Sequence, residues 1–190
     1  MSSKIKYEAY NIKNRMQGEY KMQFIKYCML FFVFLASSLI GKYISQKYRY
    51  RLEELEEIKN TLNILKTKIK FTYEPIPEIF EEISNNTSEN ISKFLKNVID
   101  KMNNETATIA WENSVDEFTG NLNQEDKQAI KTLSKLLGAT DAEGQISQID
   151  VTESFLEKQI QDASIEKDKN ERLYKKLGTI IGLAIVIILI

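Results

Sequence analysis

The chain has 190 residues, with 26 basic and 27 acidic side chains and a formal net charge of −1. Nucleic-acid-binding domains are normally clearly basic, so this charge balance argues against that class of protein. Histidine is absent, which excludes histidine-based triads and histidine metal sites, and the single cysteine, Cys28, excludes an intramolecular disulfide and cysteine-cluster metal sites. Only 7 glycines and 2 prolines are present, which disfavours a turn-rich all-β fold and favours an all-α chain.

The first 21 residues are predicted to be an N-terminal extension that is not translated natively. The tripeptide Gln17-Gly18-Glu19 can be encoded by a strong bacterial ribosome-binding sequence, which stands at normal initiation spacing before Met22. We therefore predict that native translation starts at Met22.

An uncharged run of 15 residues, 27–41, lies between Lys26 and Lys42. As a helix it is about 22 Å long, and because both flanking lysines can snorkel outward, residues 22–44 are predicted to form a first transmembrane helix. A cleaved signal peptide is the alternative. No small-residue cleavage site follows the run, and a basic amphipathic segment follows it directly, which favours an anchor.

A second uncharged run of 14 residues, 177–190, stands at the end of the given sequence. It has no polar face, which favours a second transmembrane helix over the alternative of a buried core helix. Whether so short a run crosses the bilayer completely is left open by the sequence.

The distribution of basic residues predicts the orientation of the two spans. Nine basic residues flank them on the side of the middle segment: Lys42, Lys47, Arg49, Arg51, Lys167, Lys169, Arg172, Lys175 and Lys176. Without residues 1–21, only Lys26 lies on the other side. The positive-inside rule therefore places residues 45–176 in the cytoplasm and both termini outside.

Residues 45–176 are predicted to form a six-helix bundle. A heptad stripe opens the segment: Leu52, Leu55, Ile58, Leu62, Leu65 and Ile69. Only Gly41 interrupts the path back to the first run, so one long helix is expected from the membrane to just before Pro75. Four shorter helices are expected at about 77–83, 91–102, 109–118 and 125–137. Asp141 can cap the sixth helix, which can run unbroken into 177–190.

Two patterns of small residues stand in the apolar runs, Ser37-x-x-x-Gly41 and Gly178-x-x-x-Gly182. Such pairs allow close packing of membrane helices, although a chance occurrence is the alternative for patterns this short. Trp111 could stack on a ligand, but its apolar neighbours favour a core position.

No catalytic constellation is evident in the sequence. The glycines form no phosphate-binding loop, and the many carboxylates are typical of the solvated faces of amphipathic helices. Cys28 lies among apolar residues and is expected to be inert. We therefore expect no enzyme activity, no cofactor and no metal.

Three stretches of the chain together match a known pattern. They are Ala36–Gly41 followed by Arg51, the leucine stripe and Tyr73-Glu74-Pro75-Ile76-Pro77-Glu78; residues 136–145, similar to L-G-x-x-D-x-x-x-Q; and residues 169–178 leading into the terminal apolar run. In this order and spacing, over about residues 22–190, they resemble the stage III sporulation protein AB family of endospore-forming bacteria. Trp111 also falls where that family often has Ala-Trp.

The resemblance implies a six-helix cytoplasmic bundle similar to the F-type platform domain of type II secretion and type IV pilus systems. It implies a non-enzymatic scaffold subunit of the sporulation channel, in the mother-cell membrane around the forespore. The implied partners are a cytoplasmic secretion-type ATPase (the stage III AA protein), other stage III channel proteins and membrane lipids. A homo-oligomer is left open, as are the ATPase-binding face and the cargo.

Within the second matching stretch, Gly138, Asp141 and Gln145 are the residues to single out. They fit a helix stop and restart held by a side-chain bond, which is favoured, or a contact with a partner.

Two other functions were weighed. A membrane-anchored helical signalling module would need an extracytoplasmic sensor, for which the outer segments are short. A membrane enzyme would need converging carboxylates, and neither apolar run contains one.

Overall fold

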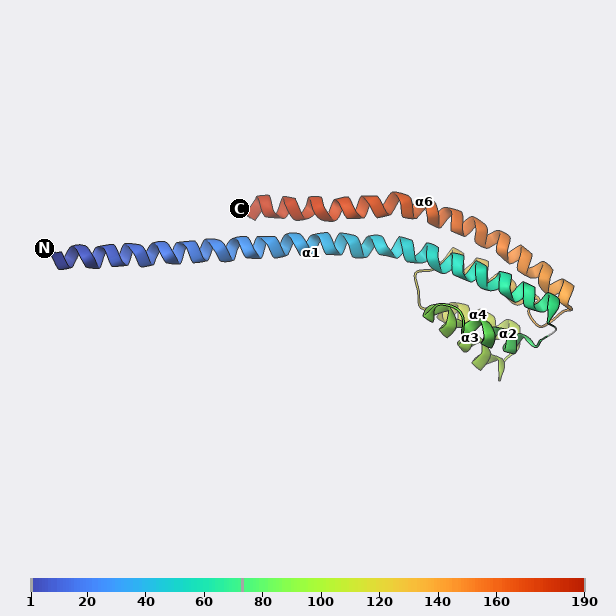
Figure 1. The fold of residues 1–190 in the computed structure, drawn as a ribbon. Coiled ribbons are helices and arrows are strands. Elements are labelled where there is room, and N and C mark those ends of the chain that lie inside the picture. Colours follow the sequence, from blue (N-terminus) through green and yellow to red (C-terminus); the bar gives the residue numbers. More distant parts are fainter. Residues whose placement is uncertain (1, 73, 190) are drawn as a thin grey trace. The chain divides into compact units, whose positions relative to one another are not determined.

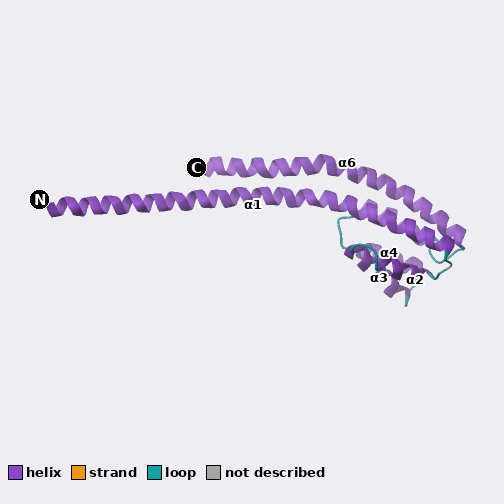
Figure 2. Ribbon diagram, viewed as in Figure 1, coloured by secondary structure: helices purple, strands orange, loops and turns teal. Residues whose placement is uncertain are grey.

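The computed structural model describes residues 2–72 and 74–189, and for residues 2–19 it describes the backbone helix only. Its elements are α1 (Ser2–Phe71), α2 (Ile76–Ser84), α3 (Glu89–Met102), α4 (Ala107–Glu117), α5 (Gln124–Lys131), the 3₁₀ helix η1 (Thr132–Lys135) and α6 (Ala142–Leu189). Within these ranges no strand is present (Figure 2). The all-α prediction with six α-helices is therefore confirmed.

The chain divides into two compact units. The helical body is Gln46–Glu171, and the helix pair is Met1–Ser45 with Arg172–Ile190. The helices α1 and α6 contribute to both units, whereas α2 to α5 lie wholly in the helical body. The predicted boundaries at residues 22, 45 and 177 and the native start at Met22 stay predictions, and Ile190 lies outside the described residues.

The core of the helical body is built around the leucine stripe of α1. Leu55, Leu62 and Leu65 are completely buried there. In the ribbon, the labelled helices α2, α3 and α4 lie beside the later part of α1 (Figure 1). Each helix adds its apolar face to one continuous cluster, including Ile79, Phe80, Ile91, Leu95, Ile130, Leu133, Leu137, Ile149 and Leu156. Burial of these side chains is the main force that holds the body together.

Trp111 on α4 lies in the centre of this core and is only 1% exposed. Its ring stacks on Phe80 at 5.8 Å between centroids and meets Phe94 edge-on at 5.0 Å. The indole Nε1 donates a hydrogen bond to the carbonyl oxygen of Ile130 at 3.0 Å, which satisfies its polar atom. Trp111 therefore has the core position that its neighbours in the sequence favour, and no surface is left for stacking on a ligand.

Several helix ends follow from local chemistry. The helix α1 ends at Phe71, ahead of the two prolines, and Pro77 sits in the first turn of α2, where a missing N–H costs nothing. Thr106 caps α4 through the N–H of Ile109. Asn123 and Asp126 form a reciprocal capping box at the start of α5.

The prediction of one α-helix over 125–137 is wrong in its second half. The α-helical part ends at Lys131, and the chain continues as the 3₁₀ helix η1. The hydroxyl of Thr132 donates to the carbonyl oxygen of Ala129 at 2.6 Å, and the side chain of Gln148 donates to the carbonyl oxygen of Thr132 at 2.5 Å. These bonds occupy carbonyl groups at this turn and favour the tighter helix.

Length and composition identify one candidate membrane span in the described residues. The helix over Tyr20–Phe71 contains an 18-residue window of mean hydropathy 1.9, of which 11% is buried. This supports membrane association of α1, although a signal sequence or a buried core helix meets the same criterion. No second helix in the described part meets it, so the second predicted span stays a prediction.

Candidate functional site

The four small residues singled out in the apolar runs meet in the helix pair. A Cβ added to Gly41 would lie 2.6 Å from the carbonyl oxygen of Tyr174, and one added to Gly178 would lie 2.9 Å from that of Ser37. Across the same contact, Gly182 faces Phe34 and Ser37. The hydroxyl of Ser37 donates to the carbonyl oxygen of Gly178 at 2.8 Å. The two backbones therefore approach so closely that side chains at Gly41 and Gly178 would force them apart.

In the helical body, a polar stripe runs along α1 beside the leucine stripe. Its members are Arg51, Glu54 and Glu57, spaced three residues apart, so they share one face of the helix. Arg51 and Glu54 are each only 6% exposed. Each of the three side chains binds a different part of the chain.

Arg51 binds the start of α5. Its Nε and Nη2 donate to the two carboxylate oxygens of Asp126, both at 2.8 Å, and Asp126 is completely buried. Its Nη1 donates to Glu166 of α6 at 2.6 Å. The hydrogen bond from the guanidinium to Asp126 is the main reason why the pKa of Arg51 is raised above its ordinary value. One guanidinium thus joins α1, α5 and α6 within the body.

The same carboxylate of Asp126 also accepts the backbone N–H of Asn123 at 2.8 Å, in the capping box of α5. Asp126 therefore has two structural roles at once, because it completes the capping box at the start of α5 and neutralises a buried cation. Its removal would leave Arg51 buried without its main partner.

Glu54 holds the loop between α4 and α5. It accepts the backbone N–H of Asn121 at 2.7 Å and the side-chain amide of the same residue at 3.0 Å. A Cβ on Gly120 would lie 2.7 Å from a carboxylate oxygen of Glu54, so this loop position favours glycine. The loop therefore depends on a carboxylate of α1.

Glu57 holds the loop before α3. It accepts the hydroxyl of Thr87 at 2.8 Å, and the backbone N–H and hydroxyl of Ser88, each at 2.6 Å. Burial acts to raise the pKa of Glu57, but these three hydrogen bonds outweigh it and the pKa is lowered. Ser88 precedes α3, so the carboxylate also lies favourably at a helix N-terminus.

The interpretation of the carboxylates of α1 as a solvated face is wrong for Glu54. Periodicity marks the apolar side of a helix, but it cannot show that a polar side chain next to that side is covered by a loop. The signal in the sequence was the spacing of Arg51, Glu54 and Glu57 by three residues alongside the leucine stripe.

Gly138, Asp141 and Gln145 come together at the start of α6. Gly138 has a φ of +69°, which glycine adopts without strain, and its N–H donates to Oε1 of Gln145 at 3.2 Å. The side-chain amide of Gln145 donates to the carbonyl oxygen of Thr140 at 3.1 Å, and Asp141 accepts the N–H of Gly144 at 2.9 Å. These bonds are those of a helix stop and restart.

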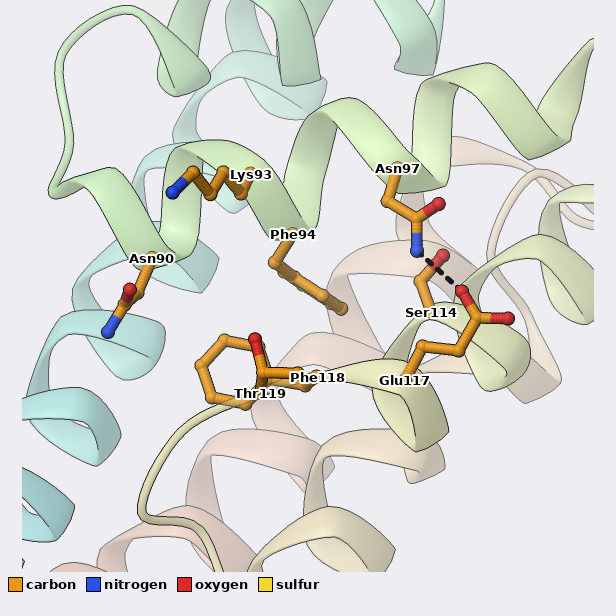
Figure 3. A pocket seen from close by; sticks show the side chains of 8 residues that line it. All are labelled: Asn90, Lys93, Phe94, Asn97, Ser114, Glu117, Phe118 and Thr119. Atoms are coloured by element: carbon orange, nitrogen blue, oxygen red, sulfur yellow. Dashed lines mark hydrogen bonds between the residues drawn. The ribbon is translucent and has the colours of Figure 1, made fainter.

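A hollow of about 150 Å³ lies between α3 and α4 (Figure 3). Its rim carries Asn90, Lys93 and Asn97, and Asn97 donates to Glu117 at 3.0 Å. The hydroxyl of Ser114 is buried there and has no hydrogen-bond partner among the described residues.

Metal chemistry has no support in the described part of the chain. No group of three or more acidic or cysteine side chains there is arranged to hold an ion. Cys28 is partly buried in the helix pair. Arg51, Glu54 and Glu57 bind other parts of the body itself.

These features define an all-helical protein with a self-contained body and an apolar helix pair. The chain belongs to the stage III sporulation protein AB family, whose model matches residues 26–190. The family is named for a stage of sporulation and not for a catalytic activity, so a role in sporulation follows.

Two similar proteins support this assignment. The chain is 24% identical over 162 residues to the stage III sporulation protein AB of Bacillus subtilis (strain 168), covering 83% of this chain and 95% of that protein. A solved structure of a stage III sporulation protein AB has a TM-score of 0.57 and 21% identity, covering 62% of this chain and 95% of the solved one. At this identity the solved structure supports the fold.

The ion pair of the body can be tested with Asp126→Ala in the full chain. We expect the free energy of unfolding to fall by about 3 kcal/mol or more, because the change leaves a buried arginine short of its main partner and removes a cap. The measurement is urea unfolding of the purified protein in neutral detergent. Lys93→Ala, which breaks the exposed pair between Lys93 and Glu89, is the control and should change stability by about 0.5 kcal/mol at most. Equal effects of the two variants would refute the role of Asp126.

The contact in the helix pair can be tested by a disulfide. In a Cys28→Ser background, Ser37→Cys with Gly182→Cys should form a disulfide on mild oxidation, because a Cβ on Gly182 would lie 3.2 Å from that of Ser37. Adding Gly178→Val should abolish it by separating the backbones. Leu39→Cys with Gly182→Cys is the matched control and should stay reduced. A disulfide that forms equally in both pairs would contradict the contact.

Proposed function

We propose that the protein is a non-enzymatic, membrane-anchored platform subunit of the sporulation channel between mother cell and forespore. In this role the helical body lies in the cytoplasm and binds a cytoplasmic secretion-type ATPase. The observation that carries the proposal is the combination of an apolar helix pair with a body in which the buried Arg51, Glu54 and Asp126 bind its own helices and loops. Such a body offers a rigid surface and no reaction centre.

The exposed apolar surface of the helix pair supports insertion into a bilayer. Large side chains of α1 stand open to the surroundings, among them Phe24, Phe31, Phe32, Leu39 and Ile40. An exposed apolar surface of this kind promotes aggregation of a soluble protein, whereas in a bilayer the hydrocarbon of the lipids covers it. The close contact at Gly41 and Gly178 supports two spans that cross the membrane together.

The charge of the helical body supports a partner with a basic surface. The helical body has 16 basic and 25 acidic residues. An excess of negative charge on a cytoplasmic body favours a partner with a basic surface and disfavours close self-association of the body. The family resemblance supports the secretion-type ATPase as that partner and the F-type platform domain as the architectural parallel.

The topology is tested by cysteine labelling in sporulating cells. In a Cys28→Ser background, a cysteine at Asn103 should react with a membrane-impermeant maleimide only after the cells are opened. Cysteines at Ser3 and Ile190 should react in intact cells if those residues are translated and exposed. Labelling of Asn103 in intact cells would contradict the cytoplasmic position of the body.

The docking function is tested with the full chain purified in neutral detergent and the purified stage III AA ATPase. We expect direct, saturable binding, measured by a sedimentation or interferometry titration. Asp141→Ala should lower the unfolding free energy by about 1 kcal/mol through loss of the cap and leave binding unchanged. Loss of binding without loss of stability would instead assign Asp141 to the interface, and absence of binding by the intact chain would refute the docking role.

A further inference from the structure

The charge of the helix pair is of one sign in the part that the structure describes. Over residues 20–45 and 172–189 there are six basic residues and no acidic one: Lys21, Lys26, Lys42, Arg172, Lys175 and Lys176. All six are exposed.

The contact between the helices brings most of these cations to one level. Gly41 lies against Tyr174 and Gly178, so Lys42 and Lys175, each next in sequence to a contact residue, lie at the same end of the apolar segments. Lys176 and Arg172 are within a turn of that level. The helix pair therefore has a basic end, defined by Lys42, Arg172, Lys175 and Lys176.

A groove of about 530 Å³ runs along the two helices towards this level. Its walls are apolar and come from both helices, with Val33, Ala36, Ile40, Leu177, Ile181 and Ile185 among them. On α1 it extends from Val33 to Ile44, about 17 Å of helix. One leaflet of hydrocarbon is about 15 Å thick, half of the bilayer core, so the groove matches the length of an acyl chain.

We propose that the helix pair binds an anionic phospholipid, with one acyl chain in the groove and the phosphate group at the basic end. This proposal rests on the membrane insertion proposed above. A second copy of the chain in the groove is disfavoured, because a symmetric neighbour in the same membrane would bring its own four cations to the same level. An anionic headgroup neutralises them, and each cation near an anionic surface strengthens binding.

The test uses the full chain purified in dodecyl maltoside and titrated with dioleoylphosphatidylglycerol or dioleoylphosphatidylcholine. Native mass spectrometry measures the retained lipid, and a thermal melt measures stabilisation. We expect phosphatidylglycerol to be retained about tenfold more tightly than phosphatidylcholine and to raise the melting temperature more. High salt should reduce the preference.

Matched variants separate the two parts of the site. Lys42→Gln with Lys175→Gln and Lys176→Gln should remove the preference for phosphatidylglycerol, whereas Lys21→Gln with Lys26→Gln should keep it. Ala36→Trp, which fills the groove, should lower retention about tenfold, whereas Leu39→Trp, on an exposed position that does not line the groove, should not. Melting of each variant in phosphatidylcholine checks that the fold is kept.

Equal retention of the two lipids by the wild-type chain would overturn the proposal, as would equal effects of the two lysine sets. Loss of self-association in Ala36→Trp with unchanged lipid retention would assign the groove to a second copy and also overturn it. Recovery of the intact chain from cells without detergent would instead refute the proposed membrane insertion. The two failures are therefore distinguishable.

Discussion

The ion pair between Arg51 and Asp126 fixes the position of α5 in the helical body. A buried guanidinium is costly unless it is paired and hydrogen-bonded, and Arg51 has a bidentate partner in Asp126 and a further one in Glu166. Because Asp126 is also the third residue of α5 and completes its capping box with Asn123, the position of that helix and the neutralisation of the cation are one constraint. The apolar core supplies most of the stabilisation, but this ion pair fixes the start of α5 against α1 in the body.

Glu54 and Glu57 extend the same logic along α1. Each accepts backbone N–H groups that a loop would otherwise leave without a partner, so one face of a single helix positions the segments before α3 and before α5. These carboxylates of α1 therefore stabilise the body's own loops.

The helix pair obeys a different constraint, the close approach of two backbones. Glycine at positions 41 and 178 allows carbonyl oxygens of the opposite helix to come within the distance at which any side chain would collide. The hydrogen bond from Ser37 to Gly178 adds a polar contact where the surroundings are otherwise apolar. Together with the exposed aromatic and aliphatic side chains, this arrangement is typical of helices that associate inside a membrane.

The sequence by itself determined the elements and their apolar faces. Hydrophobic periodicity located the leucine stripe and the four short helices, Pro75 marked the end of the first long helix, and Gly138 with Asp141 marked the restart before α6. These features follow from local chemistry, in which a residue's neighbours along the chain decide its conformation. The same local rules failed over 132–137, where contacts from the distant residue Gln148 favour a 3₁₀ helix.

Only the tertiary structure decided which polar residues are buried and what they bind. Arg51 and Asp126 are 75 residues apart, and Glu54 and Asn121 are 67 apart, so no periodicity could pair them. A charged residue beside an apolar stripe looks solvated until a loop is placed over it. The sequence also left open whether the small residues of the two apolar runs contact each other. A short pattern of small residues shows that a close approach is possible, but the packing of the chain decides which helix makes it.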